Sequence, residues 1–368
     1  MKLTAVELRR IALPLVTPFR TSFGTQHAKD ALLVRVITAD GQGWGECVAE
    51  GEPLYSAEYA DGAQDVVRRF LLPRLFAAEQ LTAGRIASLL AGIKGHPMAK
   101  AAVEMAVLDA ELSQAGQSFA TFFGSTRDRV PSGVSVGIMD SVPQLLDAVA
   151  GYLDQGYVRI KLKIEPGWDV EPVRAVRERF GDDLLLQVDA NTAYTLGDTS
   201  HLARLDAFDL LLIEQPLAED DMRGHAALAR RISTPVCLDE SITSARAAAD
   251  AIALGACQII NIKPGRVGGY LEARRIAAIA EANGVPVWCG GMVETGIGRA
   301  ANAALAAGPE FTLPGDVSAS DRFYARDITE AFVLEDGYIR VPTGPGIGVD
   351  VQLDVLDEVS TSVQTIRP

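Results

Sequence analysis

The stretch Leu184-Leu-Leu-Gln-Val-Asp189 is a short apolar run that ends in a charged residue, and four similar runs surround it. The five charged ends follow one another at intervals of 26, 25, 25 and 24 residues. A near-constant interval is typical of a repeated supersecondary unit. Because the runs are rich in leucine and β-branched residues, the unit is predicted to be a strand covered on both faces, followed by a helix. The other runs are Val158-Arg-Ile-Lys-Leu-Lys163, Leu210-Leu-Leu-Ile-Glu214, Val236-Cys-Leu-Asp239 and Gln258-Ile-Ile-Asn-Ile-Lys263.

The same period continues on both sides of these five runs. It reaches residues 133–138 on the amino-terminal side, and residues 285–291 and 311–316 on the carboxyl-terminal side. Eight parallel strand–helix units close into a barrel, and the active site of such a barrel lies at the carboxyl ends of its strands. The sequence therefore predicts an α/β fold, a (β/α)8-type barrel (modified TIM barrel) over residues 126–316.

The segments outside the barrel are predicted to form a capping domain. Residues 3–16 alternate as a strand does, and residues 31–39 and 43–49 are typical of a hairpin around Asp40-Gly41. Residues 19–24 are expected to be a loop that carries two aromatic side chains. Apolar residues at helical spacing follow at 56–78, 81–93 and 99–114. We therefore expect an α+β cap over residues 1–125, to which residues 317–368 return, with two short strands around Asp336-Gly337.

Composition and charge exclude several classes of protein. The 368 residues carry a net charge of −14, which disfavours non-specific binding to nucleic acid. The four cysteines lack the spacing of metal ligands and are expected to be small buried residues in a reducing compartment. No apolar run approaches the length of a membrane span, and the amino terminus does not resemble a signal peptide. We expect a cytoplasmic protein without nucleic-acid or membrane partners.

Three of the charged strand ends are carboxylates on consecutive strands. Asp189, Glu214 and Asp239 offer only oxygen ligands, which suit a hard divalent cation such as Mg²⁺, with Mn²⁺ or Co²⁺ as alternatives. Three protein ligands leave coordination positions for water and for a substrate carboxylate. A single acid at a strand end is as well explained as a cap of the following helix. Three acids at a constant interval on consecutive strands favour a metal site instead.

The other two charged ends are Lys163 and Lys263, which lie on strands that oppose each other across the predicted barrel. Lys161 and Lys163 alternate along one strand and so point to the same face, while Lys263 ends an otherwise apolar strand. Desolvation and neighbouring positive charge are expected to lower the lysine pKa values, which makes a neutral lysine available as a general base. A solvated lysine pair and Schiff-base chemistry are alternatives, but the second does not explain the three carboxylates.

The chain resembles the muconate lactonizing enzyme subgroup of the enolase superfamily over its whole length. It is more narrowly similar to the N-acylamino acid racemases and the related o-succinylbenzoate synthases of menaquinone biosynthesis. The motifs that carry the resemblance are Lys161-Leu-Lys163, Val188-Asp-Ala-Asn191, Ile213-Glu-Gln-Pro216, Leu238-Asp-Glu-Ser241, Asn261-Ile-Lys-Pro-Gly-Arg-Val-Gly-Gly269, Phe19-Arg-Thr-Ser-Phe-Gly24, Gly133-Val-Ser-Val-Gly-Ile-Met139, Gly290-Gly-Met-Val-Glu-Thr-Gly296 and Pro314-Gly-Asp-Val-Ser-Ala-Ser-Asp-Arg-Phe-Tyr324.

The resemblance implies roles for particular residues. Lys163 and Lys263 are the implied catalytic bases, with the three carboxylates as ligands of the metal. The family usually has isoleucine where this chain has Val293, a small change that bears on relative substrate preference. The implied substrate contacts are Ser135, Lys161, Asn191, Gly291, Met292 and Val293, with Phe19, Ser22, Phe23 and Phe323 closing over the acyl group.

The resemblance also implies a substrate and an assembly. The substrate is a small carboxylate that loses its α-proton, and the chain is expected to form a homo-oligomer, since family members are often octameric. Dipeptide epimerases and muconate-type cycloisomerases share the same site residues and are alternative functions. An inactive barrel that serves as a binding protein is a further alternative, which the intact set of five charged residues disfavours.

Overall fold

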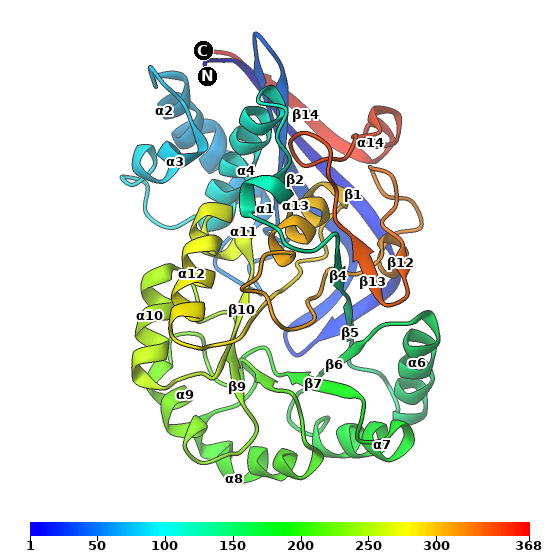
Figure 1. Cartoon of the computed structure of the whole chain (residues 1–368). Helices are drawn as coiled ribbons and strands as arrows, with labels where there is room; N and C mark the ends of the chain where they lie inside the picture. Colours follow the sequence, from blue (N-terminus) through cyan, green and yellow to red (C-terminus); the bar gives the residue numbers. More distant parts are fainter.

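A curved sheet of seven parallel strands forms the centre of the barrel in the structure, a computed structural model that describes residues 1–368 (Figure 1). Every strand pairs with its neighbour in the sequence, so the chain winds around the barrel without a crossover. The predicted (β/α)8-type fold is therefore confirmed. In sheet order the strands are β5 (Gly133–Val136), β6 (Arg159–Lys163), β7 (Leu185–Asp189), β8 (Ile213–Glu214), β9 (Val236–Leu238), β10 (Ile259–Ile262) and β11 (Val287–Cys289).

The eighth predicted strand, residues 311–316, is irregular but occupies the expected place. Phe311 forms a parallel bridge with Val287 of β11, and Gly315 forms one with Ser132, next to β5. The Asp316 N–H donates to the Cys289 carbonyl (2.9 Å). Pro314 has no N–H to contribute, which explains why a continuous ladder does not form here. The segment thus links the two edge strands and closes the barrel.

Helices follow the barrel strands. The helical region after β7 is divided into α8 (Thr199–Leu202) and a 3₁₀ segment (Ala203–Phe208), and after β10 the short helix α11 (Pro264–Val267) precedes α12 (Tyr270–Ala282). Gly268 and Gly269 separate that pair because both have positive φ (94° and 137°), which ends a right-handed helix. The remaining helices are α6 (Val142–Gln155), α7 (Val170–Phe180), α9 (Met222–Ala229), α10 (Ala245–Leu254) and α13 (Gly296–Ala306).

The cap contains an antiparallel sheet in the order β14-β1-β2-β3. The expected loop at residues 19–24 is wrong, because β1 (Leu3–Thr21) and β2 (Gly24–Thr38) pair almost to the turn, where Thr21 faces Gly24. Two prolines interrupt the ladder between Pro14 and Phe19, but pairing resumes beyond them. The predicted hairpin around Asp40-Gly41 is confirmed, with β3 at Gln42–Cys47.

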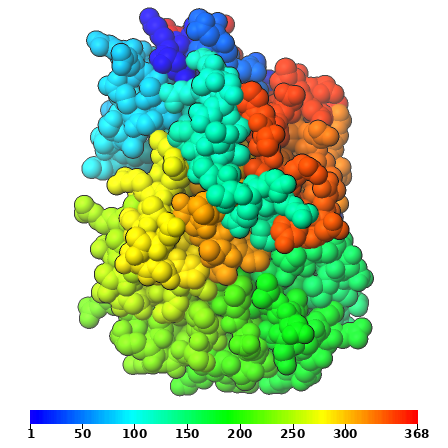
Figure 2. Space-filling model, in the orientation of Figure 1, coloured from blue at the N-terminus to red at the C-terminus, as the bar shows by residue number.

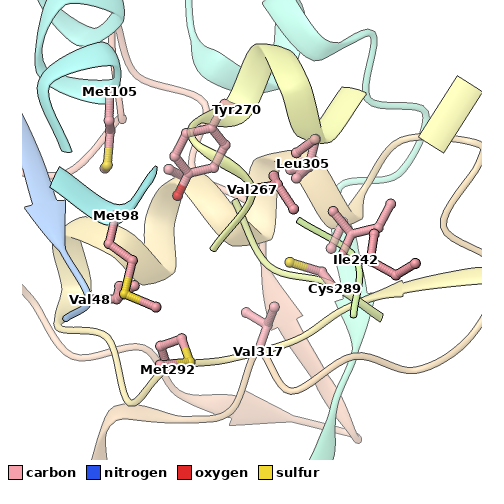
Figure 3. Packing of buried hydrophobic residues seen from close by; sticks show 14 of the residues in the cluster. Val48, Met98, Met105, Ile242, Val267, Tyr270, Cys289, Met292, Leu305 and Val317 are labelled. Atoms are coloured by element: carbon pink, nitrogen blue, oxygen red, sulfur yellow. The ribbon is translucent and has the colours of Figure 1, made fainter. Parts of the chain in front are cut away.

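The helices of the cap pack closely on this sheet. A Cβ on Gly43 or Gly45 of β3 would lie 2.2 or 2.0 Å from a backbone carbonyl of α4, so only glycine permits this approach. Buried side chains of α4, α12, α13 and the barrel form one continuous core (Figure 3). The cap helices are α1 (Ala60–Val66), a π-helical turn (Val67–Leu71), α2 (Leu72–Phe76), α3 (Ala83–Leu89), α4 (Pro97–Gln114) and α5 (Phe119–Phe123).

The carboxyl-terminal segment packs against both parts of the molecule (Figures 1 and 2). β12 (Leu334–Glu335) and β13 (Tyr338–Arg340) form a small sheet with β4 (Arg129–Pro131), and β14 (Ser360–Ile366), which follows α14 (Leu353–Val359), pairs with β1. The two termini therefore lie side by side at the cap.

The domain boundaries at 125 and 316 stay predictions. None of the helices combines the length and the apolar sequence that crossing a membrane requires.

Candidate active site

The carboxyl ends of five neighbouring strands bring the five charged residues together. Lys163, Asp189 and Glu214 are the last residues of β6, β7 and β8, and they pair in register, Lys163 with Asp189 and Asp189 with Glu214. Asp239 and Lys263 directly follow β9 and β10. All five side chains are buried. The constant spacing in the sequence thus corresponds to one ring of charges at one end of the barrel.

Each of the three carboxylates contacts a lysine. Lys163 Nζ lies 2.6 Å from Asp189 Oδ2, and Lys161 Nζ lies 3.0 Å from Glu214 Oε2. Lys263 Nζ lies 2.8 Å from Asp239 Oδ2. Lys161 and Lys163 both reach the same oxygen of Asp189, so the two side chains point to the same face, as predicted. The site is a buried network of alternating positive and negative charges.

The expected lowering of the lysine pKa values assumed a cation beside Lys161 and Lys163, and it stays a prediction. Burial lowers the pKa of Lys161, but the carboxylates of Asp316, Glu214 and Asp189 outweigh burial and raise it. Burial likewise lowers the pKa of Lys263, and surrounding oxygen groups, Tyr55 first, raise it overall. Each of these two ammonium groups is surrounded by oxygen groups of the protein, which favour its protonated form.

Asp189, Glu214 and Asp239 offer ligands that suit a cation. In the structure their oxygens do not converge on one point as the ligands of a bound metal ion do. Their oxygens are turned toward the lysines. Burial, and next the negative charge of Asp189, raise the pKa of Glu214 despite the nearby ammonium groups. Bringing a divalent cation among buried oxygen ligands would offset this repulsion. The donor set, all carboxylate, fits Mg²⁺ or Mn²⁺.

Two hollows meet at the lysines, and both are lined by Phe19, Lys163, Lys263, Gly291 and Val293. The larger, of about 280 Å³, extends toward the cap and is here called the cap-side lobe. The smaller, of about 50 Å³, extends into the barrel. Of the predicted substrate contacts, Phe23, Asn191 and Met292 line the cap-side lobe, and Ser135, Lys161 and Phe323 line the barrel-side hollow.

The two aromatic residues of the hairpin, Phe19 and Phe23, line the cap-side lobe. The Phe19 ring packs edge-on against Phe323 at 6.2 Å between centroids, and the Lys163 ammonium lies 5.9 Å from the Phe19 centroid. Phe23, at the hairpin turn, packs against Tyr55 at 6.3 Å. Ser22 differs from the other predicted contacts, because it lines neither hollow and its hydroxyl donates to the Ala190 carbonyl (3.1 Å). The hairpin turn is thereby fastened to the end of β7.

Four further residues complete the charge network, and the sequence analysis did not assign them a role. Asp316 lies 2.6 Å from Lys161 Nζ, and Glu240 accepts a hydrogen bond from Asn191 Nδ2 (2.9 Å). The Tyr55 hydroxyl accepts a hydrogen bond from Lys263 Nζ (3.2 Å), and the Arg266 guanidinium contacts Asp239. Asp316 ends the eighth periodic run and Glu240 follows Asp239, so position along the repeat could have indicated both. Tyr55 comes from the cap, and no repeat points to it.

The loop that carries Gly291, Met292 and Val293 is held from two sides. Val293 has a positive φ (56°), a strained conformation for a β-branched residue. Its carbonyl accepts a hydrogen bond from the Tyr324 hydroxyl (2.5 Å). The neighbouring Met292 carbonyl accepts one from Lys29 Nζ (2.8 Å), and the Lys29 side chain is fully buried. Residues of the cap and of the carboxyl-terminal segment therefore fix this wall of the cavity.

We expect Lys29→Met to raise KM for the substrate by about tenfold while changing kcat less, because the loop that contacts substrate is less well fixed. Steady-state kinetics, with circular dichroism to verify folding, measure this. Tyr324→Phe removes the second hydrogen bond and serves as a matched variant with the same expected direction. If both variants lose thermal stability but keep KM, the two residues support the fold and do not position the loop.

The comparisons with known families agree with this geometry. Residues 4–124 match the mandelate racemase / muconate lactonizing enzyme amino-terminal domain, and residues 144–355 match the enolase carboxyl-terminal domain-like family. The chain belongs to the enolase superfamily. The three carboxylates and the lysines of this superfamily member thus lie in its carboxyl-terminal domain, while Phe19, Phe23 and Tyr55 belong to its amino-terminal domain.

Relatives of this superfamily member are similar over nearly their full length. An N-succinylamino acid racemase from Amycolatopsis sp. is 70% identical over 98% of each chain. An o-succinylbenzoate synthase from Geobacillus kaustophilus is 47% identical over 94% of this chain and 92% of the relative. A crystal structure of an enolase-superfamily member from Listeria innocua superposes with a TM-score of 0.96 and 42% identity, covering 100% of this chain and 99% of the other.

Proposed function

We propose that the protein is a racemase of N-acylamino acids, N-succinylamino acids first among them, and that it also dehydrates the o-succinylbenzoate precursor. The observation that carries the proposal is the placement of two buried lysines on opposed strands, Lys163 after β6 and Lys263 after β10, at the meeting point of the two hollows. The similarity to relatives with both names supports the pair of activities.

The proposed reaction moves one proton at the α-carbon of the substrate. One lysine, in its neutral form, takes the α-proton and becomes an ammonium group. The electron pair left behind is delocalised onto the substrate carboxylate, which gives a planar enediolate. The lysine on the opposite face, already protonated, then donates its proton to the same carbon. No atom is gained or lost, and the configuration is inverted.

Asp189, Glu214 and Asp239 are proposed to hold a divalent cation, Mg²⁺ first, with Mn²⁺ or Co²⁺ as alternatives. When bound, such a cation supplies positive charge beside the substrate carboxylate, where negative charge increases as the α-proton leaves. Coordination would also draw the carboxylate oxygens away from the lysines. The attraction that raises the pKa of Lys263 then weakens, which favours the neutral form that a base requires.

The second proposed reaction is a dehydration and needs one base only. Lys163 removes the α-proton, hydroxide leaves from the neighbouring carbon, and Lys263 stays protonated beside the anion.

Comparing kcat/KM for the succinylbenzoate precursor with kcat/KM for N-succinyl amino acids tests which activity is the stronger. Activity on muconate or on dipeptides alone would instead support a cycloisomerase or a dipeptide epimerase. Absence of α-proton exchange with every substrate would support a binding protein.

We expect Phe23→Ala to raise KM mainly for substrates with bulky acyl groups, by about tenfold, because the ring forms part of the wall of the cap-side lobe and packs against Tyr55. KM values for N-acetyl, N-succinyl and N-benzoyl derivatives of one amino acid measure this. Val16→Ala, which removes an exposed apolar side chain of the same hairpin, is the matched control. Equal losses for all three acyl groups would contradict a role in acyl recognition.

We further propose that the chain works as a homo-oligomer in the cytoplasm, with a small carboxylate as substrate and with no nucleic-acid or membrane partner. The family resemblance and the negative net charge support this proposal. Light scattering coupled to size-exclusion chromatography measures the assembly, and a monomer at working concentration would contradict it.

A further inference from the structure

The proposed reaction does not use Gln215, which belongs to the motif Ile213-Glu-Gln-Pro216 and directly follows the carboxylate Glu214. Gln215 is fully buried. Its backbone has a positive φ (37°), which is unfavourable for any residue that carries a side chain. Such a conformation persists only where the surrounding contacts impose it, and it is frequent at functional sites. For Gln215 these contacts reach both neighbouring strands.

The main chain of Gln215 joins the ends of three strands. Its N–H donates to the carbonyl of Cys237 in β9 (2.8 Å), two residues before Asp239. Its carbonyl accepts a hydrogen bond from the Thr192 N–H (2.8 Å), in the loop that follows Asp189 at the end of β7. Gln215 itself lies at the end of β8. One residue thus connects the three segments that carry the three carboxylates.

The side-chain amide of Gln215 adds contacts to the backbone of the third carboxylate. Oε1 accepts hydrogen bonds from the N–H groups of Asp239 (2.9 Å) and Ser241 (3.2 Å). Nε2 donates to Ser241 Oγ (2.7 Å) and to the Leu217 carbonyl (3.2 Å). Because these groups are buried, losing the amide would leave backbone donors without a partner. The amide therefore holds the Asp239 backbone against the end of β8.

We propose that Gln215 is a positioning residue of the cation site, which fixes the separation of the three carboxylate-bearing strand ends and thereby favours a small divalent cation over a larger one. The inference rests on the proposed metal site and specifies how the chain selects its cation. Mg²⁺ requires near-octahedral geometry with oxygen ligands at about 2.0–2.1 Å, whereas Ca²⁺ accepts flexible geometry at about 2.3–2.6 Å. A rigid set of strand ends suits the first cation, and a loosened set suits the second.

The test measures cation affinity without turnover. Mn²⁺ is titrated into the metal-free full-length chain and followed by electron paramagnetic resonance, and Mg²⁺ and Ca²⁺ are then added as competitors. Gln215→Met keeps the length of the side chain and removes its hydrogen bonds. It is expected to weaken Mg²⁺ binding by about tenfold or more and Ca²⁺ binding by less than about threefold, so the preference for Mg²⁺ falls. Ser241→Ala, which removes one partner of Nε2, is expected to shift the preference in the same direction by a smaller factor.

The matched control is Gln187→Met, because Gln187 is a buried glutamine of β7 whose Nε2 has no hydrogen-bond partner. It should keep the wild-type affinities for both cations. Circular dichroism verifies folding, and if Gln215→Met does not fold, the ratio of affinities in Ser241→Ala decides. A folded Gln215→Met that binds both cations as the wild type does, or loses both equally, would overturn the inference. Absence of a Mn²⁺ site in the wild-type chain would instead contradict the proposed metal site itself.

Discussion

Lys163→Ala and Lys263→Ala are each expected to abolish racemisation, with kcat/KM falling by about 10²- to 10⁴-fold, the usual contribution of a positioned acid or base. The two strands that carry these lysines are separated by β7, β8 and β9 on one side of the barrel, and by β11, the eighth segment and β5 on the other. A planar intermediate between them therefore has one lysine on each face. Polarimetry with each enantiomer of the substrate measures the loss.

Proton exchange in D₂O distinguishes this arrangement from a single base. Each variant keeps the lysine that serves one enantiomer, so the two variants are expected to exchange the α-proton of opposite enantiomers. Exchange is expected to be slower than in the wild type, because the missing lysine also stabilises the anion. Lys94→Ala, which removes an exposed lysine of the cap, is the control. Residual exchange of the same enantiomer in both variants would refute the two-base arrangement.

The arrangement of the charged strand ends could be predicted because a parallel barrel turns a constant interval in sequence into neighbouring positions in space. Asp189 and Glu214 pair in register, as the spacing implies. The constant interval does not predict that the eighth strand is irregular, because the break in its hydrogen-bond ladder depends on Pro314. It also could not foresee the pairing of β1 with β2 up to Thr21, since prolines within a strand normally indicate its end.

The electrostatics of the site were harder to predict than its location. The lysine pKa values depend on which oxygen atoms surround each ammonium group, and several of those come from outside the repeat. Asp316 reaches Lys161 from the closing segment, and Tyr55 reaches Lys263 from the cap. Such contacts arise only when the barrel and cap assemble. The sequence therefore could not indicate which oxygen groups raise the pKa of Lys161 and Lys263.

The second large effect is expected from the carboxylates. Removing one of them, as in Glu214→Gln, should lower kcat/KM by about 10³-fold or more, because a lost metal ligand removes several kcal/mol of charge stabilisation. Treatment with a chelator should abolish activity, and added Mg²⁺ or Mn²⁺ should restore it. Full activity after exhaustive chelation would contradict the proposal that the reaction requires a divalent cation. Asp183→Asn, an exposed acid near the opposite end of β7, is the matched control.

Metal binding itself provides a readout that does not depend on turnover. Titration of Mn²⁺, followed by electron paramagnetic resonance or calorimetry, should give one site per chain in the wild type and a much weaker one in Glu214→Gln, Asp189→Asn and Asp239→Asn. Asn191→Ala is expected to weaken substrate binding with little effect on Mn²⁺ affinity, because its side chain contacts Lys163 and Glu240 and none of the three carboxylates. Equal loss of Mn²⁺ affinity in Asn191→Ala would place Asn191 among the metal ligands and change the proposed coordination.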